Sequence, residues 1–346
     1  MNENNQAASR PKILAHRECR IGPVQCGPRT ISLVVPCYNE EEMLPITISE
    51  LYGFLSECVA EGLAGADSEI ILVDDGSRDR TWELISRAAE EHSAIRGLKL
   101  SRNRGHQNAL LAGLEKAEGD FIISLDADLQ DDINVIKDMI RAAENGMDIA
   151  LGVRKKRETD SPFKRLSAEG FYKLMSFLKV NLVYNHADFR GLSRRAVAAL
   201  MEYKEVNLFL RGIIPELGFP TVLIYYDRKE RAAGETKYPL RKMLSFAWQG
   251  VTSFSTFPLK FVSFLGLLMA TGSLAVVAWA LSVHFFTDNA IPGWTSTVVP
   301  LLFTSGVQLL GLGIIGEYLG KMYLETKRRP RYFIEKTTDD ESRTKP

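Results

Sequence analysis

The chain has 346 residues, and its 43 lysines and arginines are balanced by 43 aspartates and glutamates. This length suits one large domain or two modest ones, and the balanced charge identifies no partner, so we expect no nucleic acid among its ligands. No Gly-x-Gly-x-x-Gly fingerprint follows the first apolar run and no Walker lysine motif is present, which disfavours dinucleotide oxidoreductases and P-loop enzymes.

Residues 1–29 are polar, rich in Asn, Arg and Pro, and lack the apolar core of a signal peptide. We expect them to form a disordered lead-in. The four cysteines show no metal-ligand spacing, and we expect them to be free thiols.

Short apolar runs alternate with amphipathic patterns between residues 30 and 153. Such alternation is typical of an α/β fold with a mostly parallel sheet that helices flank on both faces. The predicted strands cover residues 31–35, 69–73, 96–100, 121–125 and 148–153, and the predicted helices cover residues 43–58, 81–91, 107–117 and 133–144.

An acidic segment follows the fourth predicted strand. If the extended backbone persists beyond that strand, Asp126, Asp128 and Gln130 project to one side. In open α/β sheets, ligands bind at the carboxyl ends of the strands, and hard oxygen ligands suit Mg²⁺ or Mn²⁺. On its own, Asp-x-Asp fits an exposed turn equally well.

Polar clusters follow three further predicted strands, at residues 36–41, 74–77 and 101–106. In a parallel sheet these clusters and the acidic segment converge on one edge. Their side chains could bind the base and ribose of a nucleotide, while a metal held by Asp126 and Asp128 would neutralise its pyrophosphate. Any single cluster could instead be a turn or a helix cap, but four caps at four strand ends are improbable.

The second half of the chain changes in character. Residues 163–180 and 238–257 mix aromatic and aliphatic side chains with lysines and arginines, as in helices that lie in a membrane interface. For residues 163–180, a core helix with a basic outer face is the alternative.

Two stretches, residues 261–286 and 295–316, contain no Asp, Glu, Lys or Arg. Each exceeds the roughly 20 residues that a membrane-spanning helix needs. Lysines and arginines precede the first stretch and follow the second, so we expect both termini on the cytoplasmic side of a bacterial-type inner or plasma membrane. The alternative is a pair of buried helices in a soluble core.

Four motifs, at residues 36–40, 73–77, 101–107 and 126–130, resemble those of glycosyltransferase family 2, whose catalytic domain has the GT-A fold. Three later segments are similar to those of polyprenyl-phosphate glycosyltransferases, a subgroup that includes bactoprenol glucosyltransferases and dolichol-phosphate mannose synthases. These segments are residues 188–194, 207–212 and 228–239.

The resemblance implies roles for individual residues. The residues implied to bind the nucleotide sugar are Pro36, Tyr38, Glu40, Asp75 and Asp126. Those implied to surround Mg²⁺ or Mn²⁺ are Asp126, Asp128 and Gln130. Those implied to contact phosphates of the acceptor or donor are Arg211, Arg228, Arg231 and Lys237, and guanidinium groups suit phosphate oxygens. Asp126, Asp128 and Arg211 are the candidate catalytic residues.

The resemblance also implies a domain organisation. We expect a disordered lead-in (1–29), a cytoplasmic GT-A domain (30–235), interfacial helices (236–260), two transmembrane helices with a short outer loop (261–320) and a basic cytoplasmic tail (321–346). The oligomeric state stays open, a homo-oligomer included.

The implied reaction is a metal-dependent, inverting transfer of a sugar from a nucleotide diphosphate sugar to a polyprenyl phosphate, such as undecaprenyl phosphate, at the cytoplasmic membrane face. Glucose from UDP-glucose is the first choice, and mannose, an N-acetylhexosamine or an aminoarabinose derivative are alternatives. A catalytically silent membrane assembly partner on the same fold is the rival from another class.

Overall fold

The computed structural model describes residues 12–13, 28–154, 186–205, 209–227, 257–286 and 294–339. The chain divides into two compact units: residues 1–172, 181–236 and 330–346 form the first, and residues 173–180 and 237–329 form the second. The predicted interfacial helices at 163–180 and 238–256 lie outside the described residues, as do Arg228, Arg231 and Lys237.

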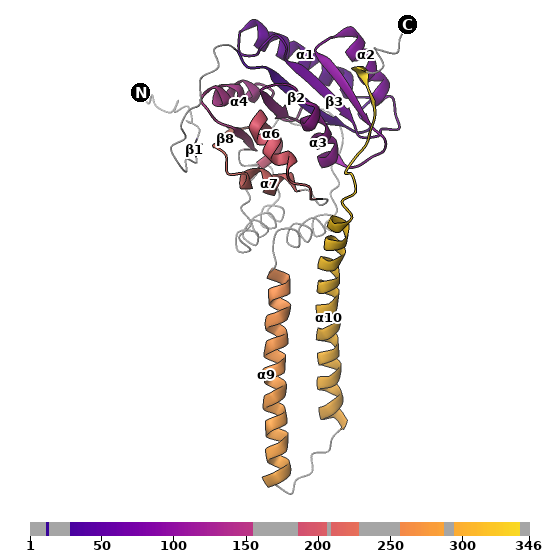
Figure 1. Cartoon of the computed structure of the whole chain (residues 1–346), viewed down its shortest axis with the longest axis vertical. Helices are drawn as coiled ribbons and strands as arrows, with labels where there is room; N and C mark the ends of the chain where they lie inside the picture. The colour runs from indigo at the N-terminus through magenta and orange to yellow at the C-terminus, as the bar shows by residue number, and fades with distance from the viewer. Residues whose placement is uncertain are drawn as a thin grey trace, which may run out of the picture. The chain divides into compact units, whose positions relative to one another are not determined.

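The first unit is built on one nine-stranded sheet with the order β1-β8-β6-β7-β5-β2-β3-β4-β9 (Figure 1). Its strands are β1 (Lys12–Ile13), β2 (Ile31–Cys37), β3 (Glu69–Asp74), β4 (Ile95–Leu100), β5 (Phe121–Ser124), β6 (Ile149–Arg154), β7 (His186–Ser193), β8 (Thr221–Tyr226) and β9 (Ile334–Thr337). Strand β7 pairs antiparallel with both β5 and β6, while β6 pairs parallel with β8. Six strands therefore share one direction and β1, β7 and β9 oppose it, so the predicted α/β, mostly parallel sheet is confirmed.

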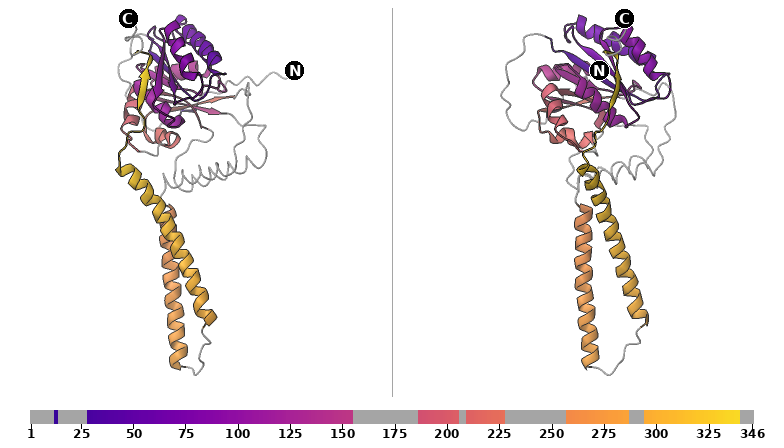
Figure 2. Two further views of the ribbon diagram at one scale, coloured as in Figure 1. Left: turned by 90° about the vertical axis from the view of Figure 1, so that its right-hand side faces the viewer. Right: turned by 45° about the vertical axis from the view of Figure 1, so that its right-hand side comes forward.

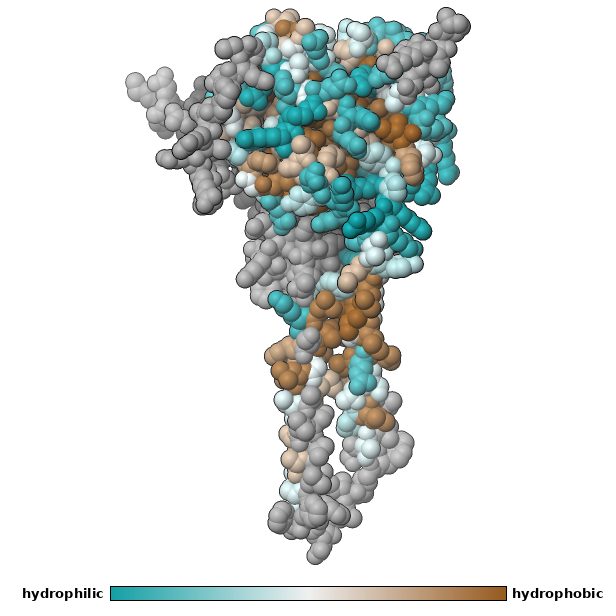
Figure 3. Space-filling model, in the orientation of Figure 1, coloured by the Kyte–Doolittle hydropathy of each residue, from teal (hydrophilic) through white to brown (hydrophobic). Residues whose placement is uncertain are grey.

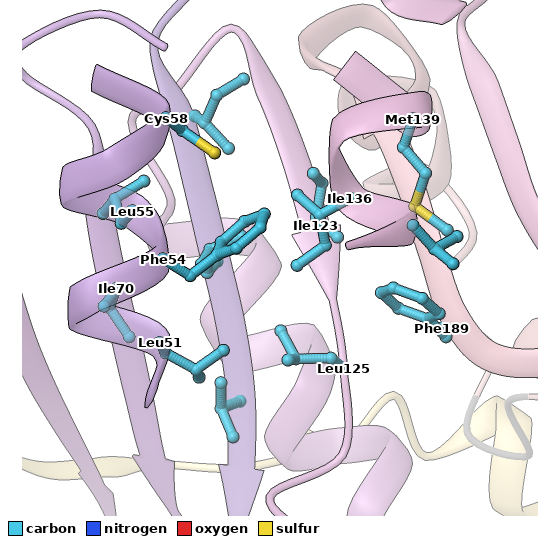
Figure 4. Packing of buried hydrophobic residues seen from close by; sticks show 14 of the residues in the cluster. Leu51, Phe54, Leu55, Cys58, Ile70, Ile123, Leu125, Ile136, Met139 and Phe189 are labelled. Atoms are coloured by element: carbon cyan, nitrogen blue, oxygen red, sulfur yellow. The ribbon is translucent and has the colours of Figure 1, made fainter. Parts of the chain in front are cut away.

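Strands β2, β3 and β5 are buried along their whole length, because helices cover both faces of the parallel part of the sheet. These helices are α1 (Leu44–Ala60), α2 (Thr81–Glu91), α3 (His106–Lys116) and α4 (Val135–Glu144). Figure 4 shows Phe54 of α1 and Met139 of α4 in one apolar cluster with Phe189 of β7. Two short helices, α6 (Arg194–Met201) and α7 (Leu210–Glu216), follow β7.

The segment that ends the first unit returns to the sheet. Strand β9, yellow in Figure 2, pairs antiparallel with β4 and forms one edge of the sheet. Beyond β9, Thr338 Oγ1 accepts a hydrogen bond from the Gly97 amide at 3.0 Å, and Asp339 pairs with Arg96 at 3.0 Å. The predicted basic tail therefore contains a strand, and two residues of the predicted disordered lead-in form β1 against β8.

The second unit contains two long helices, α9 (Phe257–Phe286), with 30 residues, and α10 (Trp294–Thr326), with 33 residues. Apolar side chains are exposed along both helices (Figure 3), including Phe264 on α9 and Leu309 on α10. When only fully described residues are considered, neither helix offers a stretch long and apolar enough to cross a membrane. The structure therefore does not confirm the two predicted membrane spans.

Candidate active site

The carboxyl ends of β2, β3, β4 and β5 lie side by side, because these four strands are parallel neighbours in register. The four polar clusters of the sequence follow these ends and therefore converge, as predicted. The loops also bind one another: the Asn39 amide donates to Ser77 Oγ at 3.0 Å, and the Glu40 amide donates to Thr81 Oγ1 at 2.9 Å. These bonds fix the loop after β2 against the loop after β3.

Asp75, predicted to bind the nucleotide, holds the loop that follows β4. Its two carboxylate oxygens accept the amides of Arg104 at 2.6 Å and Gly105 at 2.8 Å. Burial raises the pKa of Asp75, while these two amide hydrogen bonds oppose the increase. The structure thus gives Asp75 a loop-positioning contact, and its contact with a nucleotide stays a prediction.

Three other predicted nucleotide-binding residues lie at the carboxyl end of β2 or just after it. Pro36 is inside β2, so its fixed backbone helps to set where the strand ends. Tyr38 is the first residue after β2 and is 42% exposed, which leaves its ring accessible to a ligand. Glu40 accepts the amides of Met43 and Leu44 through its carbonyl oxygen, at the start of α1.

The acidic segment does not continue β5, so the condition under which strand alternation would align Asp126, Asp128 and Gln130 is not met. Strand β5 ends at Ser124, the chain turns at Ala127 and Asp128, and Leu129 has a φ of 49°. This left-handed residue reverses the backbone. Gln130 Nε2 donates to Asp128 Oδ2 at 2.6 Å, so the turn brings these two predicted metal-site residues into direct contact by a route other than strand alternation.

Asp126 lies in a strongly acidic environment. Burial raises its pKa, and the carboxylates of Asp188, Asp131 and Asp128 raise it further, against the opposing effect of His106. His106 Nε2, at the start of α3, lies 3.5 Å from Asp126 Oδ1. A cation near Asp126 would relieve this repulsion between carboxylates.

The donor chemistry of this loop fits Mg²⁺ or Mn²⁺, because such ions use one or two carboxylates together with substrate phosphates. Within the described ranges, no group of three or more His, Cys, Asp or Glu side chains is arranged to hold a metal by itself. The donor set would suit an ion that the protein shares with a substrate, and Asp126 and Asp128 as its protein ligands stay a prediction.

Arg211, the predicted phosphate-binding and catalytic residue, lies on α7 and pairs with Asp188 on β7. Arg211 Nη2 is 2.8 Å from Asp188 Oδ2, and Arg190 pairs with the other oxygen of Asp188. Burial by itself would raise the pKa of Asp188, but the Arg190 and Arg211 guanidinium groups outweigh it and hold the pKa well below its usual range. Asp188 therefore stays ionised and orients Arg211.

Sequence reasoning did not select Asp188 as a site residue, nor Gln107, which supports the same helix. Gln107 Oε1 accepts the Leu210 amide at 3.1 Å, at the first residue of α7. A further residue that was missed is Asp131, next to Gln130, which binds Arg154 and Tyr226. Asp188 could have been found from the sequence, because an aspartate and an arginine alternate with apolar residues over 188–192, as in a strand with one polar face.

Residues 32–201 match the family model Glycosyl transferase family 2. The chain is 48% identical to the uncharacterized glycosyltransferase YkoT of Bacillus subtilis (strain 168), over 88% of this chain and 91% of that protein. It is 40% identical to the prophage bactoprenol glucosyl transferase homolog of Escherichia coli (strain K12), over 88% of this chain and 98% of that protein.

A solved structure of mannosyl-3-phosphoglycerate synthase from Rubrobacter xylanophilus superposes with a TM-score of 0.43 at 15% identity, over 78% of this chain and 80% of that one. The sequence relationships carry the assignment. The chain belongs to glycosyl transferase family 2, and it is an enzyme of the glycosyltransferase class.

Proposed function

We propose that this enzyme transfers a sugar from a nucleotide diphosphate sugar to a polyprenyl phosphate, with glucose from UDP-glucose as the donor of first choice. The observation that carries the proposal is that the Asp126 and Asp128 loop and the Asp188–Arg211 pair belong to one electrostatic network at the carboxyl end of β5. The name of the Escherichia coli relative, a bactoprenol glucosyl transferase homolog, supports a polyprenyl acceptor.

The reaction needs no strong general base, because the acceptor phosphate that attacks the sugar is already an anion. The protein must position two substrates and stabilise the charge that develops on the leaving nucleotide diphosphate. Asp126 and Asp128 would hold Mg²⁺ or Mn²⁺, which supplies electrostatic stabilisation of that diphosphate. A single displacement by the acceptor phosphate inverts the configuration at the anomeric carbon.

Arg211 is suited to bind a phosphate of the acceptor. Its side chain is 39% exposed while its guanidinium stays anchored to Asp188, so a fork of donors is held in a fixed orientation. We assign Arg228, Arg231 and Lys237 to the same task from the sequence, together with Pro36, Tyr38, Glu40 and Asp75 for the nucleotide sugar and Gln130 beside the metal.

We further propose that the enzyme is integral to the membrane, with its catalytic domain and both termini in the cytoplasm. The support is in the sequence: residues 261–286 and 295–316 lack charged side chains, and lysines and arginines flank them on the terminal sides. A membrane location would give the catalytic domain access to a lipid-linked acceptor.

The test is transfer of radiolabelled sugar from a panel of nucleotide sugars to undecaprenyl phosphate by the purified full-length protein in detergent, with Mg²⁺, Mn²⁺ or EDTA. A labelled lipid formed from one donor and abolished by EDTA supports the proposal and identifies the sugar. Absence of any labelled lipid, with a normally folded protein, would instead support a catalytically silent assembly partner.

A further inference from the structure

Asp131 is a buried carboxylate that joins three separate parts of the first unit. It is 6% exposed and directly follows Gln130 in the acidic loop. Asp131 Oδ1 accepts the hydroxyl of Tyr226 at 2.6 Å and Arg154 Nε at 3.1 Å. Arg154 Nη2 also donates to both oxygens, at 3.0 and 3.2 Å. Charge-assisted bonds of this kind are short and strong.

The two partners of Asp131 lie at the ends of strands. Arg154 is the last residue of β6, and Tyr226 is the last residue of β8. Arg154 directly precedes residues 155–185, and Tyr226 precedes Arg228 by two positions. Asp131 therefore ties the loop that carries Asp126 and Asp128 to the last residues of β6 and β8.

The proposed function requires the donor and the acceptor to be held at a fixed separation, because a small misplacement of the reacting groups lowers the rate steeply. The donor-side carboxylates are on the acidic loop, and three of the four assigned phosphate-binding residues follow β8. In the described part of the chain, the Asp131 side chain joins this loop by hydrogen bonds to the last residues of both β6 and β8.

We propose that Asp131 is a positioning residue that sets the acidic loop relative to the ends of β6 and β8, an inference that rests on the proposed function. Asp131 acts on the loop that carries Asp126 and Asp128 and on the end of β8, which Arg228 follows in the sequence. Its loss therefore weakens the binding of a divalent cation with a nucleotide and the use of the acceptor together.

The alternative role for Asp131 is stability alone, and the sheet contains a matched control for it. Glu69, at the start of β3, is 7% exposed and also binds an arginine and a hydroxyl group. It accepts Arg96 Nη1 at 2.9 Å and Ser32 Oγ at 2.7 Å. Glu69 Oε1 also accepts the Glu118 amide at 2.7 Å. Because Glu69 lies at the opposite end of the strands from the candidate site, Glu69→Gln perturbs a comparable set of buried bonds away from the loop.

The experiment compares Asp131→Asn, Tyr226→Phe and Glu69→Gln in the full-length protein in detergent. Thermal unfolding reports stability, electron paramagnetic resonance titration reports Mn²⁺ binding in the presence of UDP, and initial rates give kcat and KM for the acceptor. We expect Asp131→Asn to weaken Mn²⁺ binding with UDP about tenfold, as for other residues that support metal ligands. We also expect Asp131→Asn to raise the KM for the acceptor several-fold. Tyr226→Phe should change Mn²⁺ binding and the acceptor KM in the same directions, but by smaller amounts.

The control separates positioning from stability. Glu69→Gln should lower the unfolding temperature about as much as Asp131→Asn while leaving Mn²⁺ binding and the acceptor KM at wild-type values. Wild-type Mn²⁺ binding in Asp131→Asn would overturn the inference. So would a loss of Mn²⁺ binding in Glu69→Gln that equals the loss in Asp131→Asn. If Asp131→Asn does not fold, Tyr226→Phe decides by the same criteria. A wild type that binds Mn²⁺ with UDP but forms no glycolipid would refute the proposed function, and the binding comparison would still decide the role of Asp131.

Discussion

Arg211 and Asp188 form an ion pair between α7 and β7, with Arg211 Nη2 2.8 Å from Asp188 Oδ2 and Arg211 Nε 3.3 Å from Asp188 Oδ1. The pair fixes the guanidinium of Arg211 in one plane, because both oxygens of the carboxylate accept from it. The fixed guanidinium of Arg211 and the acidic loop therefore lie at the same end of the sheet, although they are far apart in the sequence.

Substitution of Arg211 should affect use of the acceptor. We expect Arg211→Ala to raise the KM for undecaprenyl phosphate about tenfold, a loss of about 1.4 kcal/mol in binding, with a smaller change in the KM for the donor. Arg211→Lys should recover part of the loss, because a lysine restores the charge without the planar fork. Initial rates over a range of acceptor concentrations measure both constants.

Arg195→Ala is the control for Arg211→Ala, because Arg195 also pairs with an aspartate, Asp148, and its side chain is 60% exposed. Removing that pair should leave the acceptor KM unchanged. An acceptor KM that is unaltered in Arg211→Ala would remove Arg211 from the acceptor site.

Asp188 should make the stability of the enzyme dependent on pH in acid. Because the two arginines hold its pKa below the ordinary value of 3.8, its contribution to stability is complete at neutral pH and declines as the pH falls below about 4. Asp188→Asn loses that contribution at neutral pH, about 3 kcal/mol for a buried ion pair that loses one partner. We therefore expect the difference in unfolding temperature between wild type and variant to be large at pH 7 and to narrow toward pH 3.

The exposed Asp138, paired with Arg141 on α4, provides the comparison for this titration. Asp138→Asn should change the unfolding temperature little at any pH, since exposed pairs contribute at most about 1 kcal/mol. A difference between wild type and Asp188→Asn that is constant with pH would show that Asp188 is not held ionised by its arginines.

The sequence predicted the parallel part of the sheet closely but missed strands β7 and β9, and the difference has a physical explanation. Strands β2, β3 and β5 are buried on both faces, so they are continuous apolar runs that stand out in the sequence. Strand β7 was missed because it carries Asp188 and Arg190, whose charges are compensated only by each other and by α7. Strand β9 is short, and its pairing with β4 joins residues far apart in the chain.

The convergence of the four polar clusters was predicted, but the backbone geometry of the acidic segment was not. The convergence of the four clusters follows from a general property of parallel sheets, so it could be predicted from the sequence alone. The turn at Asp128 depends on the left-handed backbone of Leu129, which a non-glycine residue rarely adopts and no local pattern indicated. The contact between Asp131 and Tyr226 joins residues 95 positions apart, so only the fold brings them together.

The C-terminal strand should contribute to the stability of the first unit. Deletion of residues 334–346 removes β9, the Thr338 bond to Gly97 and the Asp339 partner of Arg96. We expect the free energy of unfolding to fall by about 2 kcal/mol, within the range typical of destabilising changes. Deletion of residues 340–346 alone is the control, because it keeps all of these contacts. Equal unfolding temperatures for the two truncated proteins would contradict a stabilising role for β9.

Substitution of Asp128 is the most direct test of the metal assignment. Asp128 Oδ1 accepts the Gln130 amide at 3.2 Å and its Oδ2 accepts Gln130 Nε2 at 2.6 Å, so Asp128→Ala removes structural contacts as well as a charge. Asp128→Asn retains one oxygen for the Gln130 backbone amide and loses the negative charge and the acceptor of Gln130 Nε2, so it perturbs the turn less than Asp128→Ala does. We expect transfer to fall at least about 100-fold in both variants, since the loss of a single preorganised electrostatic contact has effects of that order.

Two further measurements complete the test of Asp128. The unfolding temperature of Asp128→Asn should stay near that of the wild type, and Mn²⁺ binding in the presence of UDP should weaken in parallel with the loss of transfer. Raising the Mn²⁺ concentration should then recover part of the rate if the variant still binds the ion weakly through Asp126. Full transfer by Asp128→Asn at low Mn²⁺ would rule out a metal held by this carboxylate.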